Sequence, residues 1–245
     1  MKFPILATSV LLSSLLLGAC QTTSNLNTPA EYTRNTWEHQ PADCTGKQCP
    51  LFNADTLTYA DEAPLNAAMQ QRLLKLGQFD QWPATADLAQ LEQQFLSRAS
   101  KGWENYLQAK ERQQYGDFII IELSSYLFTG GAHGMPGRGF INYQRSQDRV
   151  LSLEDLLLPG QEARFWQIAE KAHRFWLHHH DLDADPEYMR QWPFQRTPHI
   201  ALLQDKLILK YDVYSIAPYS SGHPELAINY AELNGVFKPE FLPGK

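Results

Sequence analysis

The sequence predicts an α+β fold in which an antiparallel sheet is packed by a few helices, in a single compact unit with room for two lobes. Segments with the period of a strand and segments with the period of a helix both occur, without a strict alternation. No internal repeat is evident. The 245 residues, 43% hydrophobic and 20% charged, suffice for a core of ordinary size.

The first half of the chain predicts two strands separated by two helices, followed by a hairpin partner. Residues 50–59 alternate imperfectly and indicate a strand, and residues 65–77 place leucines on one helical face. An apolar period of threes and fours predicts a long helix over 85–114, with Thr85 as its cap. Alternation over 117–128 indicates a strand, and 140–145 is expected to return antiparallel to it.

The second half predicts further helices and two closing strands. Ser152 and Asp155 have the spacing of a capping box for a short helix. A longer helix is expected over 162–178, and the irregular stretch 181–198 contains a helical turn near Tyr188. Two strands, 207–213 and 225–230, are expected to complete the same sheet.

The N-terminus predicts export and lipidation. Lys2 precedes a short apolar run ending in Leu17-Gly18-Ala19-Cys20, which resembles the bacterial lipobox and would make Cys20 the acylated first residue. The run is too short for a permanent membrane span, and no later segment qualifies. The alternative is an ordinary secretory signal with a coincidental Cys.

Three regions follow from this interpretation. We expect a lipoprotein signal peptide over 1–19, a flexible tether over 20–42 that is rich in Thr, Asn, Gln and Pro, and an α+β domain over 43–245. By resemblance to such lipoproteins, Gln21 in place of Asp favours an anchor in the outer membrane of the cell envelope. Whether the domain faces the periplasm or the exterior stays open.

The formal charge of −6, with 21 basic and 27 acidic residues, argues against a nucleic-acid partner because no basic stripe occurs. Loss of Lys2 on maturation would change the charge to −6 − 1 = −7.

Cys44 and Cys49 are expected to form a disulfide in an oxidising compartment. The loop is short, so the bond would stabilise the fold by about 2 kcal/mol in the chain-entropy model. A metal site is the alternative, but it needs two more ligands and none is visible nearby.

Two loops carry the candidate binding residues. Gly130 and Gly131 precede His133, and together they suit either an oxyanion-type loop with a general base or a tight turn with a structural histidine; we favour the turn. Tyr214 and Tyr219 lie in an aromatic corner over 211–222, where tyrosines suit both recognition and packing.

The stretch His178-His179-His180 with Asp181, Asp183 and Asp185 contains residue types that bind metals. Successive helical residues point in different directions, so we interpret the stretch as a solvated helix end and predict no metal or other cofactor.

Three motifs together resemble one family. The Gly-Gly-Ala-His turn, Leu151–Leu156 and the closing Tyr-x-Ile-Ala-Pro-Tyr-x-x-Gly occur in the order found in the extracytoplasmic domain of the anti-sigma-V factor, which also occurs beside peptidoglycan deacetylase domains. The similarity covers about residues 49–233. In that anti-sigma factor the domain is a lysozyme receptor. A sigma-binding segment, a transmembrane helix and deacetylase ligands are all missing, so neither of those activities is expected here.

The resemblance and the lipobox predict a lipid-anchored envelope binding module without catalysis. Its expected partners, besides the membrane, are a lysozyme-like cationic protein or peptidoglycan. The alternative is an envelope hydrolase that uses His133. The oligomeric state is not predicted.

Overall fold

The structure is a computed structural model, and it describes residues 28–243. The predicted signal peptide, Cys20 and the beginning of the predicted tether lie outside the described residues. The α+β fold class is confirmed, with two sheets and a few helices.

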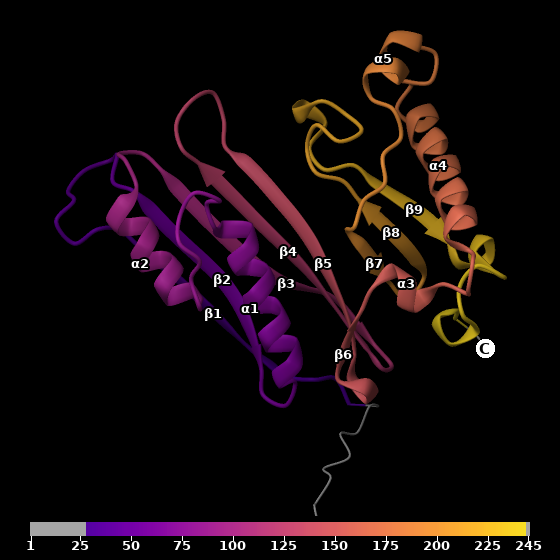
Figure 1. Ribbon diagram of the computed structural model, residues 1–245, viewed down its shortest axis with the longest axis horizontal. Helices are drawn as coiled ribbons and strands as arrows, with labels where there is room; N and C mark the ends of the chain where they lie inside the picture. Colours follow the sequence, from indigo (N-terminus) through magenta and orange to yellow (C-terminus); the bar gives the residue numbers. More distant parts are fainter. Residues whose placement is uncertain (1–27, 244–245) are drawn as a thin grey trace, which may run out of the picture.

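The larger sheet has six strands in sequence order (Figure 1). Every neighbouring pair is antiparallel except β2 and β3, which are parallel. The strands are β1 (Tyr32–His39), β2 (Leu51–Tyr59), β3 (Glu104–Tyr115), β4 (Phe118–Phe128), β5 (Met135–Gln144) and β6 (Arg149–Leu151). The parallel pair requires a long crossover, and the segment between β2 and β3 supplies it with α1 (Ala63–Gly77) and α2 (Leu88–Arg98).

The smaller sheet is antiparallel and contains β7 (Ile200–Leu202), β8 (Lys206–Lys210) and β9 (Glu225–Asn229). Three helices precede it: α3 (Leu153–Leu156), α4 (Glu162–His179) and α5 (Pro186–Gln191). In Figure 1, α1 and α2 lie across one face of the larger sheet, and α4 lies along the smaller sheet.

Each sheet has its own apolar core. The larger sheet buries residues such as Phe52 and Leu107 against Leu65 and Leu73 of α1. The smaller sheet buries Leu207 and Leu209 with Phe165 of α4, in a core that also takes in buried residues of β4 and β5 in the larger sheet. The two predicted lobes therefore correspond to two helix-covered sheets.

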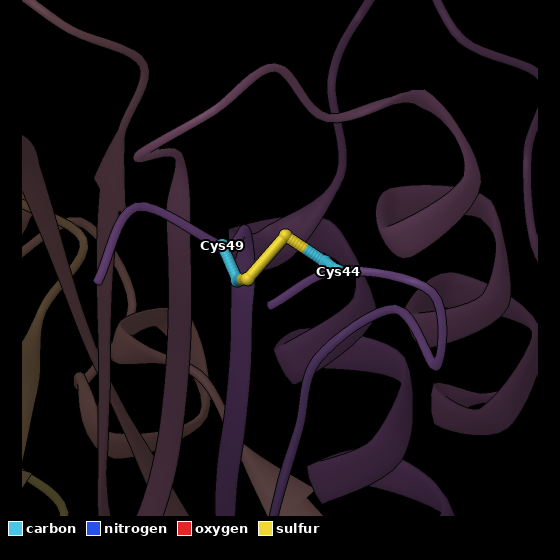
Figure 2. The surroundings of a disulfide bond; sticks show 2 residues. All are labelled: Cys44 and Cys49. Carbon is cyan, nitrogen blue, oxygen red and sulfur yellow. A yellow bond between two sulfur atoms is a disulfide. The ribbon is translucent and has the colours of Figure 1, made fainter. Parts of the chain in front are cut away.

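The disulfide between Cys44 and Cys49 is confirmed, with the two Cα atoms 5.8 Å apart. Figure 2 shows it closing the loop that leads into β2. The capping box at Ser152 is also confirmed, because its hydroxyl accepts from the Asp155 amide while the Asp155 carboxylate accepts from the Ser152 amide.

Three details of the predicted organisation are wrong. Residues 32–39 of the predicted tether form β1, which pairs along its whole length with β2. The predicted helix over 85–114 ends at Arg98, because the buried positions then alternate through Leu107 and Ala109 in a strand. The last two strands form a separate sheet with β7 and do not complete the first one.

Candidate binding surface

The two loops that carry the predicted binding residues, one with His133 and the other with Tyr214 and Tyr219, contact each other. The connection between β4 and β5 places the His133 ring 3.9 Å from the Tyr219 ring, nearly parallel to it at 25°. The Nε2 atom of His133 lies 3.2 Å from the Tyr214 hydroxyl. The Tyr219 hydroxyl donates to the Gly134 carbonyl at 3.0 Å. A hairpin loop of the larger sheet is therefore joined to a loop that follows the smaller one.

Glycines shape the hairpin side of this contact. Gly130 and Gly131 have φ values of 96° and 92°, which side-chain-bearing residues rarely adopt, and they reverse the chain after β4. A Cβ atom at Gly134 would lie 2.5 Å from the Tyr126 ring, so only glycine allows this approach. The Gly134 amide then donates to the Tyr126 hydroxyl at 3.1 Å.

The opposite loop presents its aromatic ring to solvent. Tyr214 has a φ of 65°, a strained conformation for a residue with a large side chain, and is 47% exposed. Its ring stacks on Trp192 at 6.4 Å. We call Tyr126, His133, Trp192, Tyr214 and Tyr219 the aromatic cluster.

The aromatic cluster continues onto one face of the larger sheet. Phe52 and Leu107 point toward α1 and α2, so Asn53 and Tyr106, their neighbours in the chain, point to the opposite side. We call this side the polar face. Register aligns Glu38, Asn53, Tyr106 and Tyr126 in one row across four strands.

Two hollows lie on the polar face. The first has a volume of about 320 Å³ and is lined by Glu38, Leu51, Asn53, Glu104, Asn105, Tyr106 and Tyr126. The second, of about 510 Å³, is lined by Arg34, Thr36, Trp37, Glu38, Asn53, Asp55 and Tyr106. They share three residues and so adjoin each other, and Tyr126 connects the first hollow to the aromatic cluster.

Charges on the polar face are unevenly compensated. The Arg34 guanidinium donates to both oxygens of Asp55, at 2.7 and 2.9 Å, and lowers the pKa of that carboxyl. Burial raises the pKa of the Tyr106 hydroxyl. The Glu38 carboxylate accepts from the Asn53 amide at 2.9 Å. Within residues 28–243, neither Glu38 nor Glu104 forms a salt bridge.

Ionic contacts join the smaller sheet to the polar face. The Lys210 ammonium lies 2.5 Å from Glu122 of β4 and 2.9 Å from Glu225 of β9. Asp212 accepts from the Arg138 backbone amide of β5 at 3.1 Å. These contacts add to the apolar packing between the two sheets and help to position the 211–222 loop relative to the β4–β5 hairpin.

The other predicted sites do not join the cluster. His178 pairs with Asp183 at 2.7 Å, and His180 bonds the Trp176 carbonyl. Over residues 28–243, no group of three or more His, Cys, Asp or Glu side chains is arranged to hold a metal ion. No helix in that same range is long and apolar enough to cross a membrane.

The hydrogen bonds of the His133 ring bear on a catalytic role. Within the described part of the chain they involve the Gly134 carbonyl and the Tyr214 hydroxyl. Ser125, one of the upstream serines, is buried in β4. The exposed imidazole thus contacts aromatic groups, and among residues 28–243 no carboxylate is hydrogen-bonded to it as in a hydrolytic triad.

Sequence and structure comparisons place these features in a family. The family described as "Protein of unknown function (DUF3298)" matches residues 154–231, a range that includes Tyr214 and Tyr219. The crystal structure of a DUF3298 family protein from Pseudomonas aeruginosa PAO1 is 54% identical, with a TM-score of 0.86 over 90% of this chain and 100% of that one.

Two more distant similarities concern the fold and one enzyme. A DUF3298 protein from Bacteroides fragilis shares the fold, with a TM-score of 0.67, 16% identity and coverage of 86% of this chain and 96% of that one. The peptidoglycan-N-acetylmuramic acid deacetylase PdaC of Bacillus subtilis is 24% identical over 134 residues, which are 51% of this chain and 27% of that enzyme. The match therefore spans about a quarter of the enzyme.

Proposed function

The chain belongs to the DUF3298 family, and on that premise we propose that it is a lipid-anchored binding module of the bacterial cell envelope, without catalysis, whose partner contacts the aromatic cluster. The observation that carries the proposal is the meeting of two distant loops in one exposed aromatic surface. Tyrosine and tryptophan supply large contact areas at a small cost in conformational entropy, and they are enriched where proteins recognise partners.

A cell-wall glycan is the first partner class that this surface suits. A sugar ring offers an apolar C–H face that stacks on aromatic rings, and hydroxyl groups that bond to polar side chains. The aromatic cluster and the polar face supply both kinds of contact side by side. The similarity to part of a peptidoglycan deacetylase supports the same class.

A lysozyme-like cationic protein is the second partner class. The formal charge of −6 would attract it over long range, and the resemblance to the anti-sigma-V ectodomain supports it. Exposed charges are screened beyond about 8 Å at physiological ionic strength, so purely electrostatic binding would weaken with salt.

The test measures binding of the full chain to purified peptidoglycan and to lysozyme, at low and moderate salt. His133→Ala and Tyr219→Ala should reduce binding to the true partner at both salt concentrations. Phe175→Ala is the matched control, because Phe175 is an aromatic residue that is 71% exposed on α4, outside the cluster. If neither His133→Ala nor Tyr219→Ala reduces binding, or if wild-type binding is lost at moderate salt, the proposal is refuted.

Catalysis is tested on the same samples. An envelope hydrolase that uses His133 would release soluble fragments from peptidoglycan, and His133→Ala would stop the release. The module proposed here binds peptidoglycan without releasing fragments, so a His133-dependent release would contradict it.

The lipid anchor rests on Cys20, which lies outside the described residues. Cys20→Ser should move the protein from the membrane fraction to the soluble periplasmic fraction, because the thiol that carries the acyl chain is lost. Mass spectrometry of the wild-type chain should show acylation, including palmitate. An acylated, membrane-bound Cys20→Ser protein would contradict lipidation at this residue.

A further inference from the structure

We propose that the 320 Å³ hollow on the polar face binds a hexosamine unit with a free, protonated amino group, as one unit of a glycan strand. This inference rests on the proposed function for its ligand class and adds a second subsite, with its own chemistry, beside the aromatic cluster. It is carried by four side chains: Glu38, Asn53, Glu104 and Tyr106.

The four side chains converge because of the one parallel pairing in the larger sheet. Register places Leu51 beside Glu104 and Asn53 beside Tyr106, while Glu38 lies opposite Asn53. Residues two apart on a strand share a face, so these positions form a compact patch at the ends of three strands. The cores on the other side of β2 and β3 fix the strands that carry it.

The two carboxylates of this patch favour a positively charged ligand. Glu38 and Glu104 both line the hollow, and neither has a salt bridge among the described residues. Both residues are exposed and hydrated; an acetylated amino sugar brings no charge to them, whereas an ammonium group would form charge-assisted hydrogen bonds with them. Tyrosine rings also attract cations through the negative face of the π system.

The remaining groups select a sugar. Tyr106 and Tyr126 face each other across β3 and β4 and provide an aromatic wall for the apolar face of the ring. The Asn53 amide nitrogen donates to Glu38, which leaves its oxygen to accept from a sugar hydroxyl. A volume of about 320 Å³ lies at the lower end of the range for small-ligand sites, about 300–1,000 Å³, and suits a single ring.

A bound glycan would extend from this hollow toward the aromatic cluster on one side and the second hollow on the other. Tyr126 lines the hollow, and its hydroxyl accepts from the Gly134 amide at the edge of the aromatic cluster. On the other side, the 510 Å³ hollow shares Glu38, Asn53 and Tyr106 with the first. Neighbouring units of a bound glycan would lie over these two regions.

The experiment is titration calorimetry of the full chain with three probes: a glucosamine tetramer, an N-acetylglucosamine tetramer and tetralysine. The pH is kept low enough for the amines to be protonated and high enough for carboxylates to remain ionised. We expect the glucosamine tetramer to bind about tenfold more tightly than the acetylated one, as expected for charge-assisted hydrogen bonds. Tetralysine, which has ammonium groups but no sugar ring, should bind more weakly.

Substitutions in the hollow test whether the preference for the glucosamine tetramer over the acetylated one arises there. Glu38→Gln and Glu104→Gln should each reduce the ratio of the two affinities, and the double variant should bring it close to one. Glu240→Gln removes one exposed carboxylate on the C-terminal 3-10 helix and is the matched control. Tyr106→Ala should weaken both tetramers, and Tyr106→Phe, which keeps the ring, should restore them.

Three results would overturn the inference: equal affinity for the two tetramers, a preference that survives both glutamine substitutions, or tetralysine binding as tight as that of glucosamine. If peptidoglycan still binds through His133 and Tyr219 in those cases, only the amino-sugar subsite is refuted. If the wild-type chain does not bind peptidoglycan at all, the glycan partner class itself is refuted, and with it the premise of this inference.

Discussion

The two faces of the larger sheet differ in the contacts that cover them. The face toward α1 and α2 is packed with side chains such as Phe52, Ala54 and Leu107, which are at most 1% exposed. The opposite side is divided: beneath the smaller sheet it buries Ile120 and Phe140 in an apolar core beside the Lys210–Glu122 contact, whereas the part around Tyr106 is polar. One face is closed by apolar packing, whereas the other leaves hollows beside its polar contacts.

The difference shows how one sheet can serve two purposes. Apolar packing on the covered face and beneath the smaller sheet supplies most of the stability, because burial of apolar area is the main favourable term in folding. The polar face can then retain groups that stabilise little, such as Glu38 and Glu104, which form no salt bridge within residues 28–243. Substitutions on the two faces should therefore have unequal effects on folding and on binding.

The largest expected effect comes from Leu107→Ala on the covered face. Leu107 is 0% exposed and packs so tightly on Gly77 of α1 that a Cβ there would lie 2.9 Å from its methyl groups. We expect the free energy of unfolding to fall by about 3 kcal/mol, from lost burial and the cavity that remains. Denaturant titration measures it.

Tyr106→Ala is the control for that substitution, since Tyr106 is the neighbour in the chain and points to the polar face. It should cost less than half as much stability while affecting binding. Equal losses at the two positions would show that the faces do not differ as described.

The second effect concerns the contact between the sheets. Lys210 is 8% exposed and neutralises Glu122 and Glu225, so Lys210→Ala leaves two carboxylates close together. We expect a loss of about 2 kcal/mol, less than for a fully buried pair because Arg112 also contacts both carboxylates. Lys206→Ala, on the same strand with a more exposed ammonium, should change stability little. A loss no greater than that of Lys206→Ala would mean that the ion pairs add nothing to the apolar packing and the Asn142 hydrogen bonds between the sheets.

Local features of the fold could be predicted from the sequence, and long-range ones could not. The disulfide and the capping box at Ser152 join residues at most five positions apart, so spacing alone indicates them. The helix predicted to reach Gln114 is wrong because Trp103 and Tyr106 continue the helical period by coincidence. Only the pairing of β3 with β2 and β4 shows that this segment is a strand.

The candidate site divides in the same way. His133, Tyr214 and Tyr219 could be selected because glycine turns and clustered tyrosines are visible along the chain. Glu38, Glu104 and Tyr106 carried no such signal. Glu38 lies in the segment predicted to be a tether, and Leu51 and Glu104 become neighbours only through the parallel register of β2 and β3.

The third effect is a dependence on pH at the edge of the polar face. Arg34 holds the pKa of the Asp55 carboxyl below its ordinary value of about 4. A carboxyl with a lowered native pKa adds stability above its unfolded pKa, and this is lost as the pH falls through the native pKa. At pH 7, Asp55→Asn should lower the free energy of unfolding by about 1 kcal/mol, a modest value because the Arg34 side chain is 65% exposed.

The difference between wild type and Asp55→Asn should shrink below about pH 4, as measured by denaturant titration across pH. Asp205→Asn, at an exposed carboxylate beside β8, should show no such change. A difference that stays constant down to pH 2 would mean that Asp55 stabilises β1 through its shape and neutral hydrogen bonds and not through its charge.

The smallest effect separates stability from binding at the aromatic cluster. Tyr214 has a φ of 65°, a conformation that costs an L-residue about 1–2 kcal/mol and costs glycine no strain. The gain in stability from a glycine is reduced because glycine loses more backbone entropy on folding. Tyr214→Gly should therefore be about 0.5 kcal/mol more stable than Tyr214→Ala, although both lose the ring that stacks on Trp192. Tyr219 does not have a positive φ, so at position 219 the alanine variant should be more stable than the glycine variant.

Thermal unfolding of the four variants, with peptidoglycan and lysozyme binding measured in parallel, provides the test. If Tyr214→Gly is the less stable of its pair, the backbone conformation at Tyr214 is not strained. If it is more stable and yet fails to bind, the Tyr214 ring is needed for recognition and is kept there at a cost in stability.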